Sequence, residues 1–123
     1  MLKSTQRRHV RLATPATLEA SVGLRIEVQV INLSLEGAMI EHREALSPGG
    51  GCHLFLRLGG AALSLHSRIV WSHVHSKRKG QNGEAHMRFR SGLYFPDLPE
   101  ETRASLQRYL SSLRPSTLSQ TSG

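Results

Sequence analysis

Apolar residues that occupy every second position constrain the fold of this chain more than any other feature. Two stretches show the alternation: Ile26, Val28 and Val30, and then Leu54, Leu56 and Leu58. Successive side chains of a β-strand point to opposite faces, so a period of two predicts strands that are buried on one face. Turn-forming residues at 47–51 and at Gly59-Gly60 separate such stretches and favour hairpins.

Further strands are predicted on both sides of these stretches. We expect β structure from residue 16 to about residue 42, with a turn at 21–23 and an interruption at 32–37. A longer strand is expected from about residue 62 to residue 74, and the chain then returns through residues 87–95. Between them, Lys77-Arg78-Lys79 precedes two glycines and predicts a solvated hairpin tip at 77–83. Five or six short strands of this kind are typical of a small antiparallel barrel.

Only the C-terminal part of the chain predicts a helix. Residues 96–101 supply prolines and acids, which helix starts favour. Apolar residues then form one stripe at helical spacing: Leu106, Tyr109, Leu110 and Leu113. Pro115 should end the helix, which we expect to dock on the barrel. The expected organisation is a flexible basic arm at 1–11, the barrel with its helix at 12–114, and a disordered tail at 115–123.

The charge of the chain narrows the class of partner. Its formal net charge is +7, which favours anionic partners. Four of the cations lie in the first eleven residues, and the first acid is Glu19. The charged N-terminus is followed by no apolar run, and nowhere do eighteen apolar residues run together, so neither a signal peptide nor a membrane span is expected. A single cysteine, Cys52, excludes an internal disulfide, and we expect a cytoplasmic protein.

Residue patterns that support covalent chemistry are missing. The chain has no glycine-rich phosphate loop and no Gly-x-Ser-x-Gly turn, and its only aspartate is Asp97. His73 and His75 lie two residues apart with His66 before them, but no cysteine or aspartate is close enough in sequence to complete a metal site. We therefore expect no enzyme, no catalytic residues, no cofactor and no metal.

Two short motifs point to a binding site. The first is an Arg-x-x-x-Arg pattern, Arg7-Arg8-His9-Val10-Arg11, which a chain this rich in arginine contains about once by chance. The second is an Asn-x-Ser-x-x-Gly pattern, Asn32-Leu33-Ser34-Leu35-Glu36-Gly37, which chance supplies far more rarely. A purely structural turn at 32–37 and a solvated basic arm are the alternative interpretations.

Together these motifs resemble the PilZ domain family, bacterial receptors for cyclic di-GMP. The resemblance runs from Arg7 to about Leu113 and includes the segments 68–71 and 91–95, and Asn32 stands where the family has Asp or Asn. It implies a six-stranded antiparallel barrel with a C-terminal helix, and cyclic di-GMP as the ligand. The ligand-binding residues that it implies are Arg7, Arg8, Arg11, Asn32, Ser34, Gly37 and Trp71.

The chemistry of these residues agrees with that ligand. Arginine presents a planar fork that matches a phosphate, or the O6 and N7 edge of guanine, in two hydrogen bonds. We expect Arg7 and Arg11 to clamp a base and a phosphate, with Arg8 adding charge. Asn32 and Ser34 offer polar contacts to guanine or phosphate.

The last two residues of the set, Gly37 and Trp71, would contribute in other ways. Gly37 lets the backbone approach closely, because it carries no Cβ. Trp71 either stacks on a base or belongs to the core.

The mechanism expected from this pattern is a switch. Ligand would draw the basic arm onto the turn at 32–37 and create a surface that a partner protein reads. One alternative is a PilZ-like adaptor that binds proteins and no nucleotide. Another is a barrel that binds single-stranded nucleic acid, which is disfavoured because aromatic residues make up only 5% of the chain.

Overall fold

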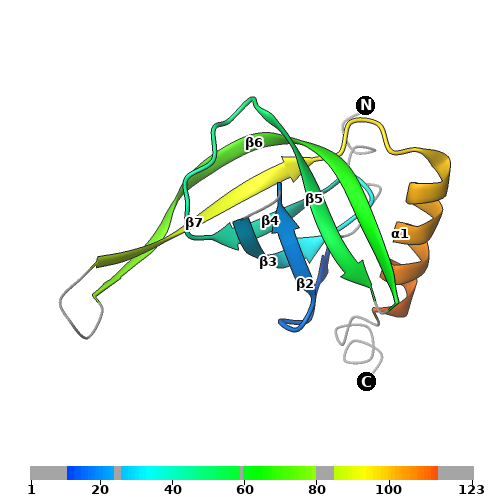
Figure 1. Cartoon of the computed structure of the whole chain (residues 1–123), viewed down its shortest axis with the longest axis horizontal. Coiled ribbons are helices and arrows are strands. Elements are labelled where there is room, and N and C mark those ends of the chain that lie inside the picture. The colour runs from blue at the N-terminus through cyan, green and yellow to red at the C-terminus, as the bar shows by residue number, and fades with distance from the viewer. Residues whose placement is uncertain (1–10, 24–25, 59, 80–84, 114–123) are drawn as a thin grey trace, which may run out of the picture.

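The computed structural model describes residues 11–23, 26–58, 60–79 and 85–113. Within these ranges the chain forms seven strands and one helix: β1 (Leu12–Ala13), β2 (Glu19–Val22), β3 (Ile26–Leu33), β4 (Gly37–His42), β5 (Gly51–Leu58), β6 (Ala61–Lys79), β7 (Ala85–Tyr94) and α1 (Glu100–Ser112). The strands pair antiparallel in the order β1-β3-β2-β5-β6-β7-β4, and a further pairing of β3 with β4 closes six of them into a barrel. Figure 1 shows this barrel with α1 at one end. The predicted fold class is confirmed.

The interior of the barrel is built by the alternation seen in the sequence. Apolar side chains from all six barrel strands are buried there: Val22, Val28, Val30, Leu33, Ala38, Ile40, Leu54, Leu56, Leu65, Ile69 and Leu93. Helix α1 packs against β6 and buries Leu106 and Leu110 of the predicted stripe. Pro99 occupies the N-cap position without a side-chain capping bond, and Glu100 and Glu101 occupy the first turn. The helix ends at Ser112, and the expected stop at Pro115 lies outside the described residues.

Three local predictions are wrong for reasons of strand register. The interruption expected at 32–37 spans only residues 34–36, because β3 continues to Leu33 and β4 begins at Gly37. The turn expected at 21–23 begins only at Gly23, which has φ 67°. Val22 still belongs to β2: it pairs with Ile26 and its side chain is buried in the core. Lys77 and the next two residues belong to β6 and pair with β7 as far as Lys79 opposite Ala85. The tip of that hairpin, residues 80–84, lies outside the described residues.

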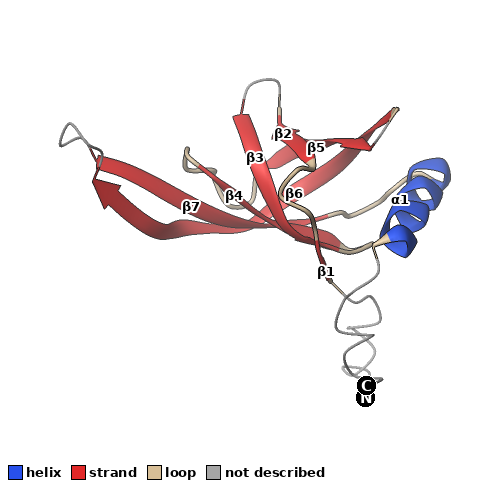
Figure 2. Cartoon of the chain, turned by 90° about the horizontal axis from the view of Figure 1, so that it is seen from below, coloured by secondary structure: helices blue, strands red, loops and turns tan. Residues whose placement is uncertain are grey.

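The last part of the β6–β7 hairpin extends beyond the barrel. β5 pairs with β6 only as far as Gly51 opposite Arg68, and β4 pairs with β7 only as far as His42 opposite Phe89. The two strands continue as a pair without these neighbours, and we call residues 74–79 and 85–89 the ribbon. Figures 1 and 2 show it projecting from the end of the barrel opposite α1.

A chain of polar groups crosses the barrel interior where the ribbon begins. His42 is 1% exposed, and its Nδ1 lies 2.6 Å from the carbonyl oxygen of Glu44. Nδ1 must donate to that carbonyl, so Nε2 of the neutral ring accepts from the Ser91 hydroxyl at 2.7 Å. Ser91 Oγ lies 2.8 Å from Ser72 Oγ. Burial lowers the pKa of His42, and the charge of Arg88 adds to this, although the bond to Glu44 opposes it.

We expect this histidine to make folding sensitive to mildly acidic pH. The unfolded chain protonates His42 near pH 6.5, whereas the folded state resists protonation, so its contribution is complete above that pH and is lost as the pH falls below it. The loss is at most about 1.4 kcal/mol for each pH unit. Urea unfolding at pH 7.5 and 5.5 should show a smaller pH dependence for His42→Gln than for the native chain. His75→Gln, at an exposed position of the ribbon, is the control and should keep the native dependence. An unchanged dependence in His42→Gln would rule out this role.

Candidate ligand-binding face

The residues singled out in the sequence meet on the outer face of the barrel. One row of paired residues runs across four strands: Asn32 on β3, Met39 on β4, Gly92 on β7 and Trp71 on β6. Residues paired across strands share a face, and the chain neighbours Leu33, Ala38 and Leu93 point into the core. The row therefore lies on the outside, and we call it the motif row.

Arg11 is held at the end of the motif row by the short strand β1. In β1, Leu12 pairs with Leu33 and Ala13 pairs with Asn32, and Leu12 packs partly buried against the core. Nη1 of Arg11 donates a hydrogen bond to Oδ1 of Asn32 over 3.1 Å, and this contact is exposed to solvent. The second arginine of one motif thus contacts the first residue of the other, across 21 positions of sequence. Arg7 and Arg8 lie outside the described residues.

Ser34 shapes the turn between β3 and β4. It is 0% exposed, and its Oγ accepts hydrogen bonds from the backbone N–H groups of Glu36 at 3.0 Å and Gly37 at 3.2 Å. Its own N–H donates to the carbonyl oxygen of Gly37 over 2.9 Å. In this structure the hydroxyl is therefore engaged inside the turn, where it fixes the loop that follows Asn32.

Gly37 is required by the approach of β4 to β7. A Cβ added at this position would lie 2.1 Å from the carbonyl oxygen of Leu93, far inside the contact distance of the two atoms. Next to it, the N–H of Phe95 donates to the carbonyl of Glu36 over 2.8 Å. The close approach expected at this glycine is thus made to β7, which ties the turn to the rest of the motif row.

Trp71 lies on the outer face, and is half-buried rather than part of the core. A Cβ at Gly92 would lie 2.3 Å from the indole Nε1, so the ring covers this glycine closely. The His73 ring stacks on the indole with 4.7 Å between centroids and an angle of 16°. The indole is therefore held in place from two sides, in the same row as Asn32.

A cluster of charges that the sequence motifs do not include lies beside the motif row. Glu41 accepts hydrogen bonds from Nε of Arg90 and Nε of Arg88, both over 3.0 Å. Nη1 of Arg90 also lies 3.9 Å from Sδ of Met39 in the motif row. Burial by itself would raise the pKa of Glu41, but the hydrogen bonds and charges of Arg90 and Arg88 outweigh it and hold the pKa below its ordinary value. The cluster thus keeps one net positive charge next to the row.

An aromatic ring lies on the other side of the motif row from this charged cluster. Tyr94 on β7 pairs with both Gly37 and Arg68, and its side chain is 46% exposed. Exposed rings beside cations suit the stacking and charge pairing of a nucleotide. Sequence reasoning missed Glu41, Arg88, Arg90 and Tyr94 as members of this face. The arginines lie 47 and 49 positions from their glutamate, and only their alternation in a strand signalled a shared face.

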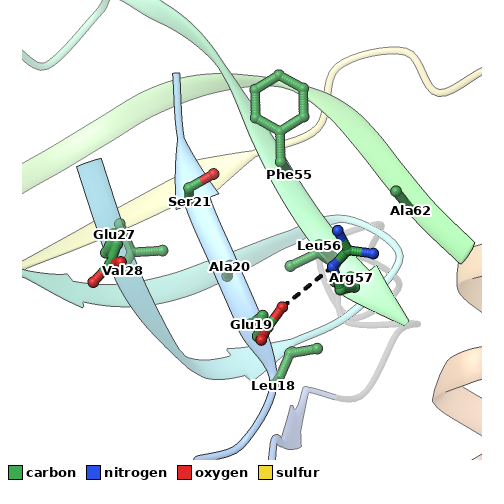
Figure 3. A pocket seen from close by; sticks show the side chains of 10 residues that line it. All are labelled: Leu18, Glu19, Ala20, Ser21, Glu27, Val28, Phe55, Leu56, Arg57 and Ala62. Atoms are coloured by element: carbon green, nitrogen blue, oxygen red, sulfur yellow. Dashed lines mark ion pairs between the residues drawn. The ribbon is translucent and has the colours of Figure 1, made fainter. Parts of the chain in front are cut away.

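Two hollows of the described surface are lined by residues outside the motif row. A shallow groove of about 560 Å³ lies over β2, β3 and β5, with Phe55 and an exposed ion pair of Arg57 with Glu19 at 3.2 Å along it (Figure 3). A second one of about 470 Å³ touches Glu41 and Arg88 of the charged cluster. The described residues contain no group of three or more side chains placed to hold a metal ion. Nor does α1, the helix described, have the length or apolarity to cross a membrane.

Fold and face together define a small antiparallel barrel on whose outer face an N-terminal arginine contacts an Asn-x-Ser-x-x-Gly turn. The chain belongs to the PilZ domain family, whose model matches residues 4–112. No curated protein sequence matches the chain.

Two solved structures share this fold. The PilZ domain with c-di-GMP of YcgR from Escherichia coli is 18% identical and aligns over 88% of this chain and 91% of its own, with a TM-score of 0.69. The Bacillus subtilis inhibitor of motility, MotI/DgrA, is 20% identical, with a TM-score of 0.53 over 85% of this chain and 48% of its own.

Proposed function

We propose that this chain is a receptor for cyclic di-GMP and binds it on the motif row. The observation that carries the proposal is the hydrogen bond from Arg11 to Asn32, which joins the two sequence motifs at one point of the surface. Membership in the PilZ family supports it, and so does the likeness in fold to the YcgR domain that was solved with c-di-GMP.

The side chains on this face suit a ligand with two guanines and two phosphates. Arg11 uses one N–H on Asn32 and keeps four further donors, enough for a bidentate contact. Asn32 keeps its NH₂ donors and a second lone pair for a guanine edge. Tyr94 offers an exposed ring face, Trp71 offers the part of its indole that His73 and Gly92 leave open, and Arg7 and Arg8 join from the N-terminal side in this proposal. Ser34 and Gly37 contribute by holding the turn in shape.

The proposal includes a relay to a partner protein. Arg7 and Arg8 would be drawn to the bound phosphates, so that the part of the arm before the positioned Arg11 becomes ordered over the turn at 32–37. Ordering a residue costs about 1–2 kcal/mol of backbone entropy, which favours a moderate affinity over a very tight one. The ordered arm with its ligand is then a new surface for the partner. We place this receptor, which carries out no reaction on its ligand, in the bacterial cytoplasm.

Titration of the native chain with nucleotides tests the proposal. Trp71 is the only tryptophan, so its fluorescence reports on the motif row directly, and calorimetry gives the affinity. We expect cyclic di-GMP to bind with a Kd in the sub-micromolar to micromolar range. GMP, GTP and cyclic di-AMP should bind at least about tenfold more weakly. Similar affinity for all four nucleotides would show that the face attracts anions without reading guanine.

A further inference from the structure

The ribbon presents an apolar face whose outer part, Val74 and Met87, is exposed in the described structure. Val74 pairs with Phe89 and Lys77 pairs with Met87, so these four side chains share one face of the ribbon. Val74 is 42% exposed and Met87 is 37% exposed. Phe89 stacks on His42, with 6.1 Å between ring centroids, and so joins this face to the barrel interior. Pairing alone does not stabilise an isolated two-stranded ribbon in water, but this one continues two barrel strands.

The charge of the ribbon selects the kind of partner. From residue 74 to residue 89 the sequence has four Lys and Arg residues, three of them consecutive at 77–79, and one acid, Glu84. Like charges at the strand edges oppose pairing with a second copy of the same ribbon. The arginines of the opposite face, Arg88 and Arg90, are held by Glu41, and the apolar face offers no exposed aromatic ring for stacking bases. An acidic protein segment fits better than a nucleic acid or another copy of the chain.

We propose that the ribbon is the docking site of an acidic partner protein. Apolar side chains of the partner cover Val74 and Met87, and its carboxylates approach Lys77 on the same face. This docking site depends on the proposed function in one respect, namely that the receptor has a protein partner. Because β6 and β7 also carry Trp71 and Gly92 of the motif row, the docking site and the ligand face share the same two strands.

Photocrosslinking from the ribbon tests this inference in the full chain. A photoreactive residue at position 74 should form an adduct, in cells of the source bacterium, with a protein segment rich in Asp and Glu. The same residue at position 104, exposed on α1 at the other end of the molecule, is the control. An adduct no stronger than at position 104, or one formed with nucleic acid, with a second copy or with a segment lacking acids, would overturn the inference.

Binding of the purified partner segment gives the second readout. Val74→Ser and Lys77→Glu should each weaken it at least about tenfold. Arg103→Glu, an equal change of charge at an exposed position of α1, should leave it unchanged. Both ribbon variants should bind cyclic di-GMP as the native chain does, which separates this site from the proposed ligand face. Weak messenger binding in the ribbon variants, or equal loss in Arg103→Glu, would show that the ribbon is not a separate docking site.

Discussion

Replacing Arg11 with alanine is expected to weaken cyclic di-GMP binding by roughly tenfold to a hundredfold or more. The variant loses a guanidinium fork that is already positioned by its hydrogen bond to Asn32. Stability should change by less than about 0.5 kcal/mol, because Arg11 is exposed and only its neighbour Leu12 packs against the core. Calorimetric titration and thermal unfolding of the same samples measure the two effects.

Two further variants separate the possible causes of this loss. Arg11→Lys keeps the charge but not the fork, so it should bind almost as weakly as Arg11→Ala. Arg57→Ala removes an exposed arginine that also has one side-chain partner, Glu19, on another part of the barrel. It should bind normally. If Arg57→Ala lost as much affinity as Arg11→Ala, the protein would attract the messenger by overall charge, and the assigned face would be wrong.

Replacing Gly37 with alanine is expected to destabilise the barrel by about 3 kcal/mol or more. The new methyl group would lie 2.1 Å from the carbonyl oxygen of Leu93, and this is backbone that cannot rotate away. β4 and β7 must separate at this point, so the pairing of Gly37 with Tyr94 and of Ala38 with Leu93 is strained. For a domain of this size the melting temperature should fall by roughly 10–15 °C.

Gly60→Ala is the matched control for this substitution. Nothing lies within 4 Å of a Cβ at Gly60, which is exposed beside the start of β6. It should unfold within about 0.5 kcal/mol of the native chain. A Gly37→Ala variant as stable as Gly60→Ala would mean that the two strands can separate without cost, and that this glycine serves the ligand alone.

Strands and motifs were predictable from the sequence because both are local. The alternation at residues 26–30 and 54–58 placed two strands of the barrel, since pleated backbone repeats every two residues. The stripe at Leu106 and Leu110 placed the helix. The spacing of Asn32, Ser34 and Gly37 marked the turn, although only the structure shows that the Ser34 hydroxyl holds its backbone.

Features that depend on register between distant strands were not predictable. Nothing local indicates that Ala13 pairs with Asn32, which brings Arg11 to the motif. Likewise, Glu41 meets Arg88 and Arg90 only because β4 lies beside β7. The start of the predicted hairpin tip at 77–79 is in fact part of the ribbon. A run of basic residues indicates exposure to solvent, and this is equally true of a loop and of a projecting pair of strands.

Amide hydrogen exchange with and without cyclic di-GMP locates the bound messenger on the barrel. Binding on the motif row should slow exchange at residues 7–13, at Asn32–Gly37 and around Trp71, and should leave α1 and β2 unchanged. The arm should be protected only when the ligand is present. Protection along the groove of Glu19, Phe55 and Arg57, with none at Asn32–Gly37, would show that the ligand binds over β2 and β5 and not on the motif row.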